Sequence, residues 1–159
     1  MSEAGPANLP MAEWPEVHCI AGAHETVAAL HRDYPLCIAT NASVSRRPMI
    51  ERALERVGLH HYFSDVFCFT EIGHRKETPE FWEVVSRTLG FPLHELAMVG
   101  DTLEADVLAP RRSGVFSVWF NQDGHQPAAA CSIPVITRLT EFVTLVQNHQ
   151  GGRRPTGCD

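Results

Sequence analysis

Short runs of apolar residues alternate along the chain with longer stretches in which apolar positions recur every three or four residues. Continuous runs are typical of strands buried on both faces, whereas the spaced positions are typical of helices that bury one face. The pattern predicts strands at 36–40, 65–70, 96–100, 115–120 and, shorter, at 133–136. It predicts helices at 23–32, 47–57, 79–89, 103–113 and 139–148. This alternation indicates an α/β fold with a mostly parallel sheet that helices cover on both faces.

The 159 residues suit one domain with a single core. Residues 1–16 are rich in Ala, Pro and Glu and lack periodicity, so we expect a flexible N-terminal arm there. The pattern assigns residues 17–149 to the core domain. Residues 150–159 are expected to form a disordered tail.

Composition narrows the classes of partner. The net charge of −6 argues against nucleic acid and anionic membranes as partners. No apolar run approaches the roughly 18 residues of a membrane span, and residues 1–15 do not resemble a secretory signal. The five cysteines, at 19, 37, 68, 131 and 158, are odd in number and form no Cys-x-x-Cys motif. Reduced thiols in a cytoplasmic protein are the expectation.

Polar residues follow two of the predicted strands, and a lysine lies between them in sequence. Thr40 and Asn41 end one strand, Asp101 and Asp106 follow another, and Lys76 precedes a helix. Ligands of such folds bind beyond the carboxyl ends of the strands. A hydroxyl, an amide and a lysine can hold a phosphate, and two carboxylates can hold Mg²⁺. Each of these residues could instead have a purely structural role and bind neither phosphate nor metal, as a helix cap or as a charged residue on the surface.

Taken together, the three segments resemble the haloacid dehalogenase (HAD)-like hydrolase superfamily. Its second motif is a strand ending in Thr or Ser, as in residues 37–41. Its third is a lysine shortly before a helix, as in residues 76–82, where Glu77 replaces the usual proline. Its fourth is Gly-Asp followed by a further Asp, as in residues 98–107. The resemblance covers about residues 22–146 and implies a Rossmann-like three-layer sandwich.

The resemblance also implies roles for the site residues. Thr40 and Lys76 are the candidate catalytic residues, and Thr40, Asn41 and Lys76 the candidate substrate-binding residues. Asp101 is expected to bind Mg²⁺ directly, and Asp106 to support the metal. The paired acids favour the phosphatase branch, with a small phosphorylated metabolite as substrate.

The family's first motif, Asp-x-Asp at the end of the first strand, does not occur in this chain. Upstream of Thr40 the one aspartate is Asp33, at a helix end and without a second acid in place. The family's first Asp is the nucleophile, so activity of this chain is expected to be impaired or absent. The cap domain is missing as well. Two interpretations stay open: a fragment of a longer enzyme, or a natural degenerate member that binds a phosphate ligand or a protein partner.

The family's first strand lies between the strands predicted at 36–40 and 96–100. Without it, two rows of backbone N–H and C=O groups lack partners. Three solutions are open: residues 17–21 fill the position, the two strands pair directly, or pairing occurs across a homodimer.

Overall fold

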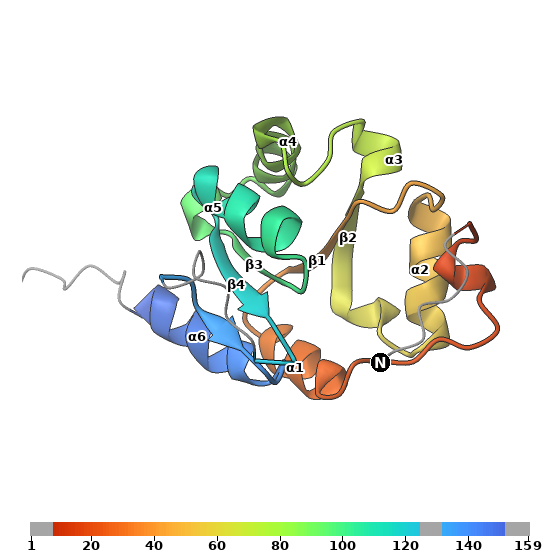
Figure 1. The fold of residues 1–159 in the computed structure, drawn as a ribbon, viewed down its shortest axis with the longest axis horizontal. Helices are drawn as coiled ribbons and strands as arrows, with labels where there is room; N and C mark the ends of the chain where they lie inside the picture. Colours follow the sequence, from red (N-terminus) through yellow and green to blue (C-terminus); the bar gives the residue numbers. More distant parts are fainter. Residues whose placement is uncertain (1–7, 125–131, 152–159) are drawn as a thin grey trace, which may run out of the picture.

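The computed structural model describes residues 8–124 and 132–151, and all of its strand pairings are parallel (Figure 1). The strands are β1 (Leu36–Thr40), β2 (Phe63–Cys68), β3 (Ala97–Gly100), β4 (Phe116–Phe120) and β5 (Val135–Ile136). The helices are α1 (Ala23–Leu30), α2 (Arg47–Arg56), α3 (Phe69–Ile72), α4 (Pro79–Leu89), a π-helix (Leu103–Leu108), α5 (Ala109–Arg112) and α6 (Glu141–Gly151). Short 3₁₀ turns lie at Met11–Glu13, His60–Tyr62 and Leu93–Glu95.

Helices cover both sides of the strands, as predicted. Figure 1 shows α4 and α5 above the strands and α1 and α6 below them. On the α4 side the core contains Phe81, Trp82 and Val85, packed with Phe67 of β2. On the other side Leu30, Phe142 and Val146 pack against β4 and β5 residues. The predicted Rossmann-like α/β sandwich is confirmed.

The strands form two separate sheets instead of one. One sheet has the order β1-β2 and the other the order β3-β4-β5. Residues 17–21 lie outside both sheets, and Ile20 among them is 48% exposed. Direct pairing of β1 with β3 is also absent. Filling of the position by residues 17–21 and direct pairing of the two strands are therefore wrong for the described part of the chain. Pairing across a homodimer stays a prediction.

Several predicted bounds are shifted by one to three residues, and two of the differences have a visible cause. The second strand, predicted at 65–70, spans Phe63–Cys68, and the chain then turns into α3, which ends at Gly73 with a φ of 79°. The helix predicted at 103–113 is a π-helix followed by α5. Pro110 has no N–H for the regular helical ladder, which explains an irregular junction there.

Residues 12–15 of the N-terminal segment contact Arg56 of α2. Met11–Glu13 forms a 3₁₀ turn, and the Arg56 guanidinium donates to the carbonyl oxygens of Ala12, Trp14 and Pro15 at 2.9, 2.6 and 3.0 Å. Several donors on one planar group can hold an irregular segment in this way. Residues 1–7, and residues 152–159 of the predicted tail, lie outside the described residues.

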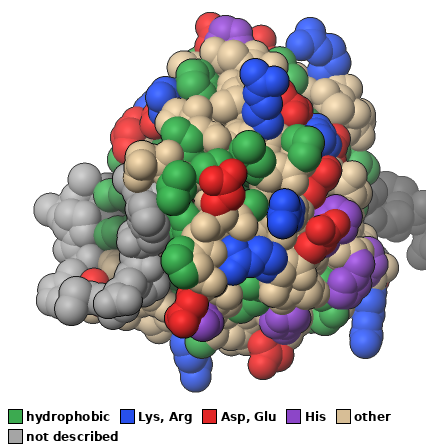
Figure 2. All heavy atoms as spheres, turned by 90° about the vertical axis from the view of Figure 1, so that its right-hand side faces the viewer, with side chains coloured by type: hydrophobic (Ala, Val, Ile, Leu, Met, Phe, Trp, Pro, Cys, Tyr) green, Lys and Arg blue, Asp and Glu red, His purple; other side chains and the backbone are tan. Residues whose placement is uncertain are grey.

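The molecular face that carries α2 and α3 mixes acidic, basic and histidine side chains without a patch of one sign (Figure 2). No helix within the described ranges is long and apolar enough to cross a bilayer.

Candidate active site

A buried ion pair joins the third and fourth motifs. The Lys76 amine donates to one carboxylate oxygen of Asp106, although 30 residues separate the two in the chain. Lys76 is 8% exposed and Asp106 4% exposed. The second Asp106 oxygen accepts the backbone N–H of Thr102 at 3.0 Å. The burial of two charges indicates a built polar site, because unpaired charges are rarely tolerated inside proteins.

Asn41 connects this pair to the end of β1. Its amide oxygen accepts the backbone N–H of Lys76 at 2.9 Å. Its amide nitrogen donates to a Glu77 carboxylate oxygen at 2.7 Å. A proline at the position of Glu77 would have no such acceptor, so this departure from the family pattern adds a hydrogen bond. The predicted residues Asn41, Lys76 and Asp106 therefore form one connected group.

Thr40 and Asp101 occupy the two strand ends beside this group. The Thr40 hydroxyl accepts the backbone N–H of Ala42 at 3.1 Å, which tightens the turn after β1. Asp101 is exposed, and its carboxylate accepts the Thr102 hydroxyl at 3.4 Å. Their roles toward phosphate and metal stay predictions.

Gly100 permits the close approach of the β3 end to Asp106. A Cβ atom at this position would lie 2.4 Å from the Asp106 carboxyl carbon. Real Cβ atoms do not tolerate such contacts. The glycine is therefore required by the position of the buried carboxylate and the turn that holds it.

The carboxylates of Asp101 and Asp106 are the type of ligand that Mg²⁺ prefers. The described side chains do not supply a complete set of ligands. Within 8–124 and 132–151, no three His, Cys, Asp or Glu side chains gather into a metal-binding group. Asp106 already uses both oxygens, so Asp101 is the exposed carboxylate of the pair that can face a cation. Mg²⁺ often takes only one or two protein carboxylates and completes its shell with water and phosphate.

Two buried tryptophans donate hydrogen bonds to the backbone of the site loops, contacts that the sequence pattern did not reveal. The Trp82 indole N–H donates to the Lys76 carbonyl at 2.8 Å, and the Trp119 indole N–H donates to the Asp101 carbonyl at 2.9 Å. Trp82 is 3% and Trp119 9% exposed. A tryptophan in an apolar run indicates burial, and a buried indole N–H needs a partner, but the pattern does not show which carbonyl accepts it.

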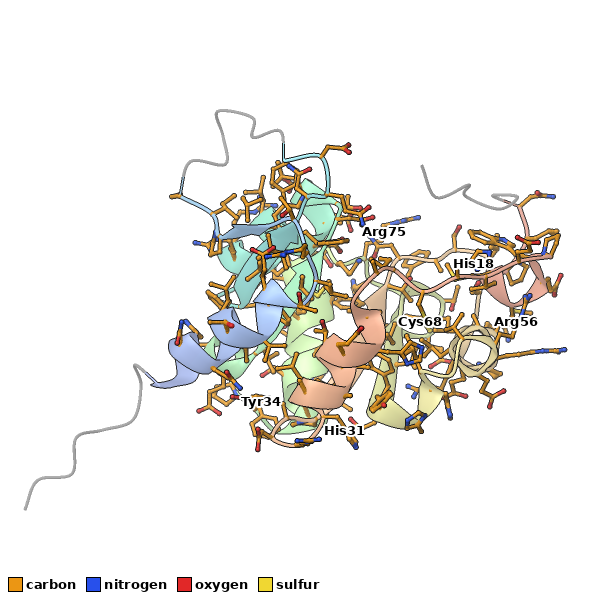
Figure 3. All side chains as sticks on the ribbon, turned by 90° about the horizontal axis from the view of Figure 1, so that it is seen from below. His18, His31, Tyr34, Arg56, Cys68 and Arg75 are labelled. Carbon is orange, nitrogen blue, oxygen red and sulfur yellow. The ribbon has the colours of Figure 1, made fainter. Side chains whose placement is uncertain are left out.

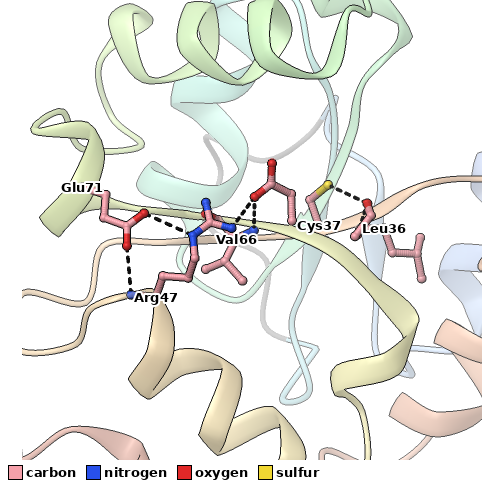
Figure 4. Close-up of polar contacts among 7 residues, drawn as sticks. Leu36, Cys37, Arg47, Val66 and Glu71 are labelled. Carbon is pink, nitrogen blue, oxygen red and sulfur yellow. Dashed lines mark hydrogen bonds and ion pairs between the residues drawn. The ribbon is translucent and has the colours of Figure 1, made fainter.

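A second polar network, also missed, surrounds Arg47 at the start of α2 (Figure 4). Its guanidinium donates to the Asp65 carboxylate at 2.5 Å, the Val66 carbonyl at 2.7 Å and the Glu71 carboxylate at 3.2 Å. The hydrogen bond to Asp65, followed by that to Glu71, raises the pKa of Arg47. Arg47 thereby connects α2, β2 and α3.

An apolar cavity of about 320 Å³ separates β1 from β3. Cys37 and Ala39 line it from β1, and Ala97 and Met98 from β3. Other lining residues come from α1, α4 and α6, from Phe67 of β2, and from the segments before β1 and β3, including Tyr34, which is labelled in Figure 3. We call this cavity the slot.

Cys37, a slot residue, is expected to react slowly with alkylating reagents at neutral pH. Burial raises the pKa of the Cys37 thiol above its ordinary value of 9.0, so the reactive thiolate is scarce. The alkylation rate, followed by peptide mass spectrometry, should rise with pH and reach half its maximum above pH 9.0. A half-maximum at or below that value would contradict the effect of burial; Cys37→Ser serves as the assignment control.

Comparison with known proteins gives a consistent set of relatives. A family model described as haloacid dehalogenase-like hydrolase matches residues 14–114. The pyrimidine 5'-nucleotidase PynA of Streptococcus pneumoniae is 31% identical over 104 residues, which cover 64% of this chain and 43% of PynA. A glyceraldehyde 3-phosphate phosphatase of Methanopyrus kandleri is 34% identical over 73 residues, 46% of this chain and 31% of the relative.

Solved structures give the same picture of the fold. The magnesium-bound HAD-hydrolase YfnB of Bacillus subtilis has a TM-score of 0.70 and 26% identity over 80% of this chain and 55% of that one. An uncharacterized protein of Listeria monocytogenes has a TM-score of 0.77 at 22% identity, covering 90% of this chain and 87% of that one. The chain thus spans less than half the length of PynA and about half that of YfnB.

Proposed function

The chain belongs to the haloacid dehalogenase-like hydrolase family, and on that premise we propose that it forms the phosphate- and metal-binding half of a Mg²⁺-dependent phosphatase site for small phosphate esters. The buried Lys76–Asp106 pair, joined through Asn41 to the end of β1, carries this proposal. It brings together motifs that are far apart in sequence at the carboxyl ends of the strands, where ligands of parallel sheets bind. The phosphatase and nucleotidase names of the relatives support the reaction class.

Each residue has a chemical part in this proposal. Lys76 lies in the site as a cation that offsets phosphate charge, and Asp106 orients its amine. Thr40 and Asn41 supply a hydroxyl and an amide beside it. Asp101 holds the Mg²⁺, which when bound would offset phosphate charge and polarise the phosphorus.

The chain alone is expected to bind phosphate and to hydrolyse esters poorly or not at all. No Asp-x-Asp pair occurs in these 159 residues. Asp33 precedes β1 and so lies at the amino end of the strands, opposite to Thr40. Asp101, which follows β3, is assigned to the metal, so no Asp-x-Asp nucleophile is available at a strand end of this chain. The same observation favours a second candidate function, a non-catalytic protein that binds a phosphate ligand or a protein partner.

The proposed substrate is a small phosphorylated metabolite in the cytoplasm. Cys19, Cys37 and Cys68 carry free thiols, which suits a reducing compartment. The net charge of −6 and the mixed charges of Figure 2 give no support to nucleic acid as substrate.

Mg²⁺ and inorganic phosphate together are expected to stabilise the chain against heat. At ligand concentrations about tenfold above the dissociation constant, linkage gives about 1.4 kcal/mol, a rise in Tm of several degrees for a protein of this size. Asp101→Asn should lose this rise, because the exposed carboxylate at the strand end is removed. The measurement is a thermal-shift titration with each ion alone and with both.

Glu83→Gln is the matched control, since Glu83 is an exposed acid on α4. It should respond like the unmodified chain. An undiminished response of Asp101→Asn would remove Asp101 from the site. No response of the unmodified chain to either ion would remove the phosphate site altogether. Measured hydrolysis of an aryl phosphate by the chain alone would support the phosphatase over the second candidate, a non-catalytic binding protein.

A further inference from the structure

Arg75 is an exposed cation whose side chain lies over an aromatic ring. It directly precedes Lys76 in the chain and is labelled in Figure 3. Its guanidinium carbon lies 4.4 Å from the centroid of the Phe69 ring. A guanidinium that rests on a ring face is held by the ring while its N–H groups can still donate to a ligand. Arg75 therefore offers a positioned positive charge one residue before the buried lysine of the candidate active site.

The acids that are near Arg75 in sequence have other partners. A carboxylate oxygen of Glu77 accepts the amide N–H of Asn41 at 2.7 Å. The carboxylate of Glu71, in α3, accepts the guanidinium of Arg47 at 3.2 Å. In the part of the chain that the structure describes, no acid forms an ion pair with Arg75. Its charge is thus available to an anion from solution.

The ring under Arg75 belongs to the strand next to the candidate phosphate site. Phe69 follows Cys68, and Cys68 is the register partner of Thr40 in the β1-β2 pair. Neighbouring strands lie about 4.8 Å apart, so the backbone of Phe69 lies beside the end of β1. Thr40 and Asn41, the candidate phosphate-binding residues, occupy that end. The Arg75–Phe69 contact therefore adjoins the phosphate site on its β2 side.

Hydrogen bonds fix both partners of this contact. The Arg75 carbonyl accepts the backbone N–H and the hydroxyl of Thr78, each at 2.9 Å, which closes the turn that carries Arg75. The Thr70 hydroxyl donates to the Ser45 carbonyl at 2.8 Å, which fastens α3 and its Phe69 to the segment after β1. A cation that is ordered before binding loses less entropy when a ligand arrives.

We propose that Arg75 binds a second anionic group of the substrate, a carboxylate or a further phosphate, while Lys76 offsets the charge of the phosphate ester. The planar guanidinium can donate two parallel hydrogen bonds to such a group. This inference rests on the proposed function and narrows its substrate class to phosphate esters that carry another anionic group. Phe69 is a positioning residue, because it acts on the ligand only through Arg75.

Matched pairs of ligands test the second anionic group. Each pair consists of an ω-carboxyalkyl phosphate and the alkyl phosphate of the same chain length, and longer pairs place the two anionic groups farther apart. Titration calorimetry in the presence of Mg²⁺ gives the dissociation constants. At the best length we expect the carboxylate ligand to bind about fivefold more tightly than its alkyl partner, the upper range for an exposed ion pair. Added salt should reduce this preference.

A second series replaces the carboxylate with a phosphate. Alkane bisphosphates are compared with the alkyl phosphates of the same length. The series with the larger preference identifies the second anionic group as a carboxylate or as a phosphate.

Variants assign the preference to Arg75 and its ring. Arg75→Gln should remove the preference, so that each dianionic ligand binds like its alkyl partner. Arg75→Lys should keep part of the preference, because an ammonium retains the charge and lacks the planar fork. Phe69→Leu should weaken it, whereas Phe69→Tyr, which retains an aromatic ring, should preserve it. Arg87→Gln is the matched control, since Arg87 is an exposed basic residue in the last turn of α4, and it should keep the full preference.

Several results would overturn the proposal. Equal affinity within every matched pair would show that no second anionic group is bound, and would leave the phosphate site intact. A preference that survives in Arg75→Gln would assign the second group to another cation. Loss of the preference in Arg87→Gln would show that it reflects the net charge of the chain. Absence of binding by every phosphate ligand would remove the phosphate site and this inference together, so the two failures are distinguishable.

Discussion

Replacing Asp106 with alanine is expected to lower the free energy of unfolding by about 3–5 kcal/mol, a cost typical of breaking one side of a buried ion pair. The substitution leaves the Lys76 amine buried without its carboxylate partner. It also removes the acceptor of the Thr102 N–H. Both losses leave buried polar groups unsatisfied, which costs more than the net gain from forming the same bonds.

Urea unfolding of Asp106→Ala and of Lys76→Met/Asp106→Leu shows how much of the lost free energy of unfolding comes from the unpaired Lys76 charge. The double variant replaces both charges with apolar groups, so it should recover most of the lost stability. Glu104→Ala is the control, because the Glu104–Arg112 pair is more than half exposed and is expected to contribute less than about 1 kcal/mol. A loss no larger than that of Glu104→Ala would show that water reaches and satisfies Lys76.

Gly100→Ala is expected to destabilise the fold by about 1–3 kcal/mol, the usual cost of overpacking, and to abolish the response to Mg²⁺ and phosphate. The added methyl group would meet the Asp106 carboxyl group at 2.4 Å. Gly100 has no positive φ, so the backbone itself accepts alanine. The damage therefore acts through displacement of Asp106 and of Lys76, which is bonded to it.

The matched control is Gly90→Ala, at the end of α4. Gly90 has a φ of 73°, and no atom lies within 4 Å of the position of an added Cβ, so alanine there strains the backbone without touching the site. Both variants should lower the Tm. Only Gly100→Ala should lose the thermal shift with Mg²⁺ and phosphate, and retention of that shift would contradict the steric account.

The sequence predicted the order of the helices and strands better than it predicted how the strands pair in the sheet. Apolar periodicity located each strand of the part of the chain that the structure describes, because burial on both faces requires a continuous apolar run. The contact between Lys76 and Asp106 followed from resemblance to a family. Apolar periodicity alone would not have predicted this contact, because periodicity does not show which strand ends are neighbours.

Other features depend on tertiary contacts, which the pattern of apolar and polar residues along the sequence does not predict. Nothing in the run 36–40 shows that one edge of β1 borders a cavity. Arg47 reads as an ordinary helix residue until Asp65 and Glu71 are placed beside it. The end of β2 was misjudged because Phe69 is apolar in α3 as it would be in a strand.

The indole hydrogen bonds have a consequence for the mechanics of ligand capture. The loop that carries Lys76 and the turn that carries Asp101 are each fastened to a ring embedded in the core, Trp82 and Trp119 respectively. Neither loop can shift without breaking a bond to its ring or dragging that ring from its packing. Under the proposed function, the two loops are therefore held in place before a ligand binds, and little ordering entropy is lost on binding.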